Sequence, residues 1–118
     1  MSPSEQQTYA VAFLTAAGPY PWWWAFPAEW DSEDDVPNGW SVVVRVEDRA
    51  GDVRDVAVTH AQVLDAIKRI AADEAKGITA ETFELAKRFL ADPEPADWDA
   101  ASGDQVLQLV TLGAIVHE

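Results

Sequence analysis

The chain has no cysteine, one methionine and only two histidines. Without cysteine there is no disulfide, no zinc–thiolate site and no cysteine nucleophile. Neither His60 nor His117 has a partner at the spacing of a metal site or a catalytic triad, so both are expected at the surface. The sequence also lacks an HExxH motif, a phosphate-binding glycine loop and a nucleophile elbow. We therefore expect a non-enzymatic protein with no metal and no cofactor.

Basic residues are absent from both ends of the chain. All eight lie between Arg45 and Arg88 together with nine of the acids, and the formal net charge is −13. The N-terminal acidic flank (residues 1–44) and the C-terminal acidic flank (residues 89–118) hold six acids each and no base. Such a field repels nucleic acid and anionic membranes and attracts cations or basic protein surfaces. We expect no direct nucleic-acid binding; the alternative is that the charge serves solubility alone.

A long uncharged run near the start raises the question of a membrane span. Residues 6–28 carry no charge, but they contain three prolines and a glycine and are preceded by Glu5. A signal peptide begins with basic residues, and a spanning helix does not tolerate this density of proline without support. We expect a soluble protein that makes no membrane contact, with the cytoplasm as its location.

Two short runs of alternating polarity predict an antiparallel β-hairpin. The first is Trp40–Glu47, which would direct Trp40 and three valines to one face, and the second is Val53–Val58. Residues 37–39 form a turn signal before the first run, and residues 49–52 form the connecting turn. An exposed edge of this hairpin leaves room for a homodimer.

Capping residues predict the starts of three helices. Thr59 and Gln62 form a capping box, and Thr79 is an N-cap for the next helix. Ser102 and Gln105 form a second capping box, which would open a short helix that is apolar on nearly all sides. A helix of that kind is buried at the centre of a fold.

The remaining boundaries complete the predicted architecture. Gly77 and Gly113 are expected to end helices in the left-handed conformation. Residues 4–17 are either a helix capped by Ser4 or a buried strand, and the alanines favour the helix. With a length of 118 residues, we expect one compact α+β domain over residues 1–118, in which the hairpin packs against three to four helices.

Residues 19–39, here called the tryptophan–acid loop, are the most unusual part of the sequence. From Pro19 to Trp40 the chain reads PYPWWWAFPAEWDSEDDVPNGW, with five of the six tryptophans, five acids and no base. Tryptophans pack in cores or at interfaces, so the rings belong to the domain core, a protein interface or a small-ligand platform. We expect an ordered loop. The candidate interface residues are Trp22, Trp23, Trp24, Trp30, Glu29, Asp31, Glu33, Asp34 and Asp35.

Two other features of the acidic flanks have plain structural explanations. The acids of residues 31–35 suggest calcium, but the EF-hand pattern fails because Val36 stands where a glycine is needed. Trp98 lies between two aspartates in a proline-broken linker, and we expect it to pin that linker to the core.

Several stretches together resemble a family of small uncharacterised proteins from actinobacterial genomes and their phages. They are YPWWWAF, WSVVVRVED, VTHAQVLDAI and ADWDAASGDQVLQLVTLGAIV. The resemblance implies a phage or mobile-element origin and a bacterial host cytoplasm, and it carries no functional residues.

The leading hypothesis is a protein that binds another protein, basic or DNA-binding, through its tryptophan-rich acidic surface. The alternatives are a nucleic-acid mimic that inhibits a DNA-binding protein, an immunity-like inhibitor, and a carboxylate-based cation-dependent enzyme.

Overall fold

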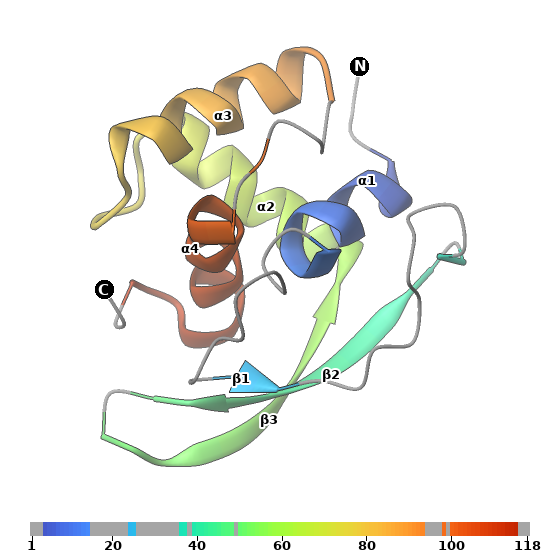
Figure 1. Ribbon diagram of the computed structural model, residues 1–118, viewed down its shortest axis with the longest axis vertical. Coiled ribbons are helices and arrows are strands. Elements are labelled where there is room, and N and C mark those ends of the chain that lie inside the picture. The colour runs from blue at the N-terminus through green and yellow to red at the C-terminus, as the bar shows by residue number, and fades with distance from the viewer. Residues whose placement is uncertain are drawn as a thin grey trace.

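The fold is α+β, with a small antiparallel sheet covered on one face by helices (Figure 1). The computed structural model describes residues 4–14, 24–25, 36–37, 39–48, 50–93, 98 and 100–115. The strands are β1 (Trp24–Ala25), β2 (Ser41–Glu47) and β3 (Val53–Thr59). The helices are α1 (Glu5–Tyr9), the π-helix η1 (Ala10–Leu14), α2 (His60–Ala71), α3 (Ala80–Ala91) and α4 (Ala100–Leu112).

The predicted hairpin is confirmed in β2 and β3. The strands pair from Ser41 opposite Thr59 to Glu47 opposite Val53. As the alternating pattern predicts, one face of β2 is buried: Trp40 and the even-numbered valines are at most 3% exposed. A third strand was not predicted: β1 pairs antiparallel with the other edge of β2, placing Trp24 opposite Val46. The sheet order is therefore β1–β2–β3.

The N-terminal segment is a helix, as its alanine content favoured. Ser4 caps α1, since its Oγ accepts the Gln7 N–H at 3.1 Å and the Gln7 Oε1 accepts the Ser4 N–H at 2.7 Å. After Tyr9 the chain continues as η1, and Tyr9 and Phe13 are both fully buried. This short segment therefore supplies two of the largest aromatic side chains of the core.

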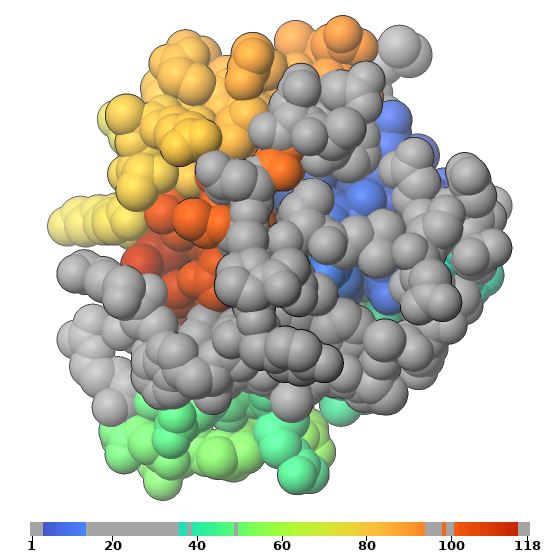
Figure 2. Space-filling view, in the orientation of Figure 1, coloured from blue at the N-terminus to red at the C-terminus, as the bar shows by residue number. Residues whose placement is uncertain are grey.

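The helices build the core in two layers above the sheet. The valines of β2 meet Val63 and Ile67 of α2 and Leu107 of α4 in one buried cluster. Helix α3 packs outside α2 and α4, so it lies at the opposite end of the molecule from the β2–β3 turn (Figure 1, Figure 2). Trp98 is 6% exposed and meets Phe89 edge-on with centroids 5.8 Å apart, which confirms that it pins the linker.

The predicted start of α4 is wrong. The helix begins at Ala100, and Ser102 is already inside it, 2% exposed, with its Oγ accepting a hydrogen bond from Thr82 Oγ1 at 2.8 Å. Gln105 accepts the N–H of Thr79, the N-cap of α3, at 3.2 Å. The pair predicted to cap its own helix thus joins α4 to the start of α3, because the tertiary contact competes for the same polar groups.

The predicted end of α2 at Gly77 is also wrong. The helix stops at Ala71 with Ala72 as C-cap, and the residue that turns left-handed is Asp73, at φ 59°. Gly77 has φ 81° but lies later in the connection to α3. The prediction for Gly113 is confirmed, since it directly follows α4 with φ 78°.

Gly77 and Gly113 provide a matched pair for a stability test. Both have positive φ, but a Cβ on Gly77 would lie 3.1 Å from the Ile115 Cβ, whereas one on Gly113 would meet nothing within 4 Å. We expect Gly113→Ala to cost about 1 kcal/mol of unfolding free energy and Gly77→Ala about 1–2 kcal/mol more. Urea denaturation monitored by circular dichroism measures the difference; equal costs would show that Ile115 moves away freely.

Candidate protein-binding surface

Helix α1 holds the C-terminal end of the tryptophan–acid loop. The backbone carbonyl of Glu5 accepts the indole N–H of Trp40 at 2.7 Å, and its side-chain Oε2 accepts the Gly39 N–H at 2.8 Å. The Gln6 side chain donates to the carbonyl of Val36 at 3.1 Å. Val36 is itself 3% exposed. Consecutive residues of α1 therefore fix the loop where its acidic run ends.

Trp40 belongs to the core. Its ring lies edge-on to Tyr9 and Phe13, with centroids 5.4 and 5.9 Å away. These aromatic contacts and the bond to Glu5 satisfy both the apolar face and the polar N–H of the indole. Of the five tryptophans in the stretch from Pro19 to Trp40, this last one serves packing.

The sheet holds the loop at a second point. Trp24 and Ala25 form β1 on the edge of β2, so the chain is anchored there and again at Val36. Among the nine candidate interface residues, the structure describes the backbone position of Trp24 alone. The other eight lie outside the described residues: Trp22, Trp23, Trp30, Glu29, Asp31, Glu33, Asp34 and Asp35.

Helix α1 also holds the C-terminal acidic flank. The side chain of Gln7, next to Gln6, donates to the carbonyl of Pro93 at 3.2 Å. Pro93 lies between Asp92 and Glu94, whereas Val36 directly follows the acidic run of residues 31–35. Two adjacent glutamines thus tie Val36 and Pro93, which are far apart in sequence, to the same short helix. Sequence reasoning missed this contact, because a glutamine carries no signal of a distant backbone partner.

His60 is the first residue of α2, as expected, but it is half-buried instead of lying fully at the surface. Its Nδ1 is 2.9 Å from Thr8 Oγ1, and that hydroxyl donates its one proton to the Glu5 carbonyl at 3.0 Å. When this hydroxyl donates to Glu5, it accepts at His60 in the tautomer whose Nδ1 carries the proton. The contact ties α1 to α2, and its role is structural. Within the described residues, no group of three or more His, Cys, Asp or Glu side chains is placed to hold a metal ion.

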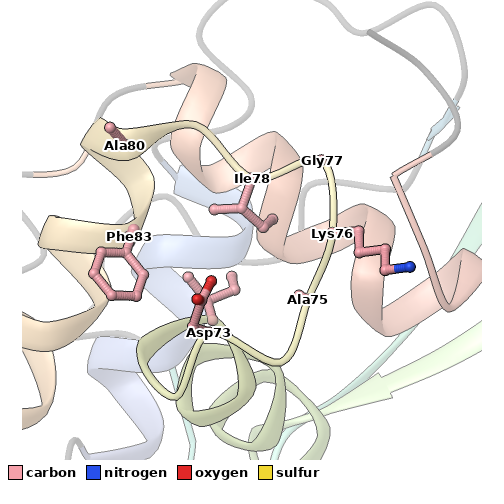
Figure 3. A pocket seen from close by; sticks show the side chains of 8 residues that line it. Asp73, Ala75, Lys76, Gly77, Ile78, Ala80 and Phe83 are labelled. Carbon is pink, nitrogen blue, oxygen red and sulfur yellow. The ribbon is translucent and has the colours of Figure 1, made fainter.

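An open hollow of 490 Å³ lies at the connection between α2 and α3 (Figure 3). Its lining is mostly apolar and includes Ile70, Ile78 and Phe83. The Asp73 carboxylate points toward these side chains, whereas the Lys76 ammonium group points away from them. One carboxylate is too few for the convergent acids that the cation-dependent enzyme alternative requires of a pocket.

No helix in the part of the chain that the structure describes is both long and apolar enough to cross a membrane. In comparisons with known proteins, no family model matches the chain, and neither a curated protein nor a solved structure matches it.

Proposed function

We propose that this protein is a non-enzymatic binding protein that engages a basic protein partner through the tryptophan–acid loop. The observation that carries the proposal is the pair of hydrogen bonds from Gln6 to Val36 and from Gln7 to Pro93. They attach Val36 and Pro93, each next to an acidic run in the sequence, to one helix. Acidic runs attached to one helix would repel each other, and the cationic surface of a partner would compensate that repulsion.

The chemistry of the loop fits a protein partner. Interfaces combine a few large aromatic anchors with a charged rim that steers association, and the loop has tryptophans beside acids in its sequence. Its two anchor points, β1 and Val36, limit the entropy that the loop loses on binding. The proposed setting is an actinobacterial phage or mobile element acting in a bacterial cytoplasm, and it rests on the sequence stretches quoted above.

Neutralising the loop tests the proposal. A tagged pull-down from an actinobacterial lysate would compare wild type with two variants that each remove four negative charges. The loop variant is Asp31→Asn, Glu33→Gln, Asp34→Asn and Asp35→Asn. The control variant changes exposed acids elsewhere: Asp52→Asn, Asp65→Asn, Glu74→Gln and Glu84→Gln.

We expect the loop variant to reduce capture of the main bound protein about tenfold and the control variant to change it less than about twofold. High salt should release the partner, since it screens charge–charge attraction. Equal losses in both variants would show that net charge, and not the loop, controls binding. Retention of the partner by the loop variant would contradict the proposal.

The role of the tryptophans has a separate readout. Trp23→Ala with Trp30→Ala should abolish capture while leaving the melting temperature within a few degrees, because interface anchors contribute to binding more than to folding. Unfolding of this double variant would assign the two rings to the core and count against an interface.

A second candidate is a nucleic-acid mimic, and the attachment of both Val36 and Pro93 to α1 favours it. Carboxylates gathered from distant segments could occupy the phosphate-binding groove of a DNA-binding protein. In that case duplex DNA should elute the captured protein, and binding should depend steeply on salt. A partner that stays bound in excess duplex DNA would exclude the mimic and leave the simpler binding function.

A further inference from the structure

Within the described part of the chain, β3 is an edge strand with β2 on one side and no strand on the other. In an antiparallel hairpin, alternate residues direct their backbone N–H and C=O groups toward the neighbouring strand. Asp48 N–H bonds to the Asp52 carbonyl at 2.9 Å, which assigns the even positions of the hairpin to the β2–β3 ladder. The odd positions of β3 therefore face outward. Thr59 agrees, since its N–H leaves the ladder and meets Gln62 Oε1 at 2.9 Å.

Three consecutive outward-facing positions of β3 remain: Val53, Asp55 and Ala57. Among the described residues none hydrogen-bonds to their backbone groups on that side. All three side chains are exposed, Val53 by 60%. Exposed edges with free donors and acceptors pair readily with another strand unless something blocks them. No proline or lysine occurs in β3 to do so.

We propose that this edge pairs with the same edge of a second copy, joining two three-stranded sheets into one across a two-fold axis. The register follows from the side chains. With Asp55 placed on the axis, Ala57 lies opposite Val53 of the partner subunit. Since Val43 already pairs with Ala57 inside one copy, the row Val43, Ala57 and the partner's Val53 becomes continuous.

This row accounts for an otherwise unexplained feature of the outer face. Val43 and Val53 are the large apolar side chains that stand exposed in the described residues, at 57% and 60%. They come from different strands and lie apart in one copy, yet the two-fold register brings one from each copy to either side of Ala57. Apolar cross-strand neighbours of this kind stabilise sheets.

The central row is balanced in charge. Asp55 lies 3.2 Å from the Arg45 guanidinium, and the two are cross-strand partners. On the axis the row therefore reads Arg45, Asp55, the partner's Asp55 and the partner's Arg45. Each carboxylate arrives with its own cation, so the meeting of two acids is compensated.

Other registers lose these matches. A shift by two residues in one direction sets Val53 against the partner's Asp55. A shift in the other direction sets Val53 against the partner's Thr59, whose N–H already serves Gln62. The register centred on Asp55 alone pairs the three open positions with one another.

Engineered cysteines test the register directly, because the chain has no cysteine of its own. Opposed residues of a hydrogen-bonded pair have Cα atoms about 5.5 Å apart, within disulfide range. Asp55→Cys should therefore give a covalent dimer under mild oxidation. In the same dimer Val53→Cys would place its two sulfurs four residues apart along the strands, about 14 Å. We expect it to crosslink at least about tenfold more slowly.

A charge-matched pair of variants tests the surface without cysteine. Val53→Lys puts a lysine in the apolar row, and Ala91→Lys adds the same charge at the exposed end of α3, far from β3. We expect sedimentation equilibrium to show a weak wild-type dimer that is populated at about 200 µM and dissociates near about 2 µM. Val53→Lys should weaken it about tenfold or more, and Ala91→Lys should not.

Salt separates this interaction from the binding function proposed above. Two copies of net charge −13 repel each other, so salt should strengthen the dimer, whereas it should release a basic partner. A wild-type protein that stays monomeric at all concentrations and salts would overturn the proposal. So would equal crosslinking of the Asp55→Cys and Val53→Cys variants. Neither result bears on the binding of a basic protein.

Discussion

Replacing Trp40 with alanine is expected to lower the free energy of unfolding by about 3–5 kcal/mol. The ring is 3% exposed, lies edge-on to Tyr9 and Phe13, and donates its N–H to the Glu5 carbonyl. Truncation would therefore open a cavity between the sheet and α1 and also remove one hydrogen bond from the Glu5 carbonyl, which keeps the bond from the Thr8 hydroxyl. Urea unfolding monitored by far-ultraviolet circular dichroism measures the loss.

Trp40→Phe separates the two contributions. Phenylalanine keeps most of the buried area and loses the N–H, so we expect it to cost about 1–2 kcal/mol. The remainder of the alanine effect is then packing. A loss below about 1 kcal/mol for Trp40→Ala would contradict the placement of this ring in the core.

Trp98→Ala is expected to have the second largest effect, about 3–4 kcal/mol. Trp98 is 6% exposed and contacts the Phe89 ring of α3 edge-on, so its loss removes the contact that holds the C-terminal linker against α3. Guanidinium unfolding measures the change.

A double-mutant cycle with Phe89→Leu identifies the aromatic part of that effect. Edge-on pairs contribute about 0.5–1.5 kcal/mol beyond their buried area, and the coupling energy should lie in this range. A coupling energy near zero would mean that Trp98 is held by its other neighbours and that the ring geometry contributes nothing.

The sheet and most helices could be predicted because their signals are local. Alternating valines in β2 fix which face is buried, and Thr79 with a following apolar stripe marks the start of α3. The predicted starts of α2 and α3 agree with the structure for this reason. Strand β1 could not be predicted, since two residues between prolines and tryptophans carry no periodicity.

One error occurs where a distant group competes for a local capping signal, and the other where an earlier residue ends the helix first. Ser102 and Gln105 have the spacing of a capping box, but both side chains hydrogen-bond to the N-terminal end of α3. Gly77 has the positive φ of a helix end, yet Asp73 adopts that conformation first. Ser102 and Gln105 do form hydrogen bonds, but with another helix. Gly77 does have a positive φ, but α2 has already ended before it.

The sequence was sufficient to identify the residues of the candidate surface, but not the contacts that hold it to the fold. Tryptophans and acids drew attention to the loop, and Trp40 could be assigned to the core from its place at the head of an alternating strand. The hydrogen bonds from α1 to Val36 and Pro93 could not be predicted, because nothing in the sequence distinguishes Gln6 and Gln7 from other polar helix residues.

The hydrogen bonds from α1 to Val36 and Pro93 also set an order in which contacts form during synthesis. Gln7 leaves the ribosome before its partner Pro93, which is 86 residues later in the chain. The β2–β3 hairpin and α2 involve neighbouring residues and can form while the chain is still growing. The contacts of Tyr9 and Phe13 with Trp40, and of Thr8 with His60, can form once the start of α2 has been made, whereas the bond from Gln7 waits for Pro93. The attachment of α1 to Pro93 is therefore the last of these contacts to form, and a chain stopped before Pro93 would lack this bond.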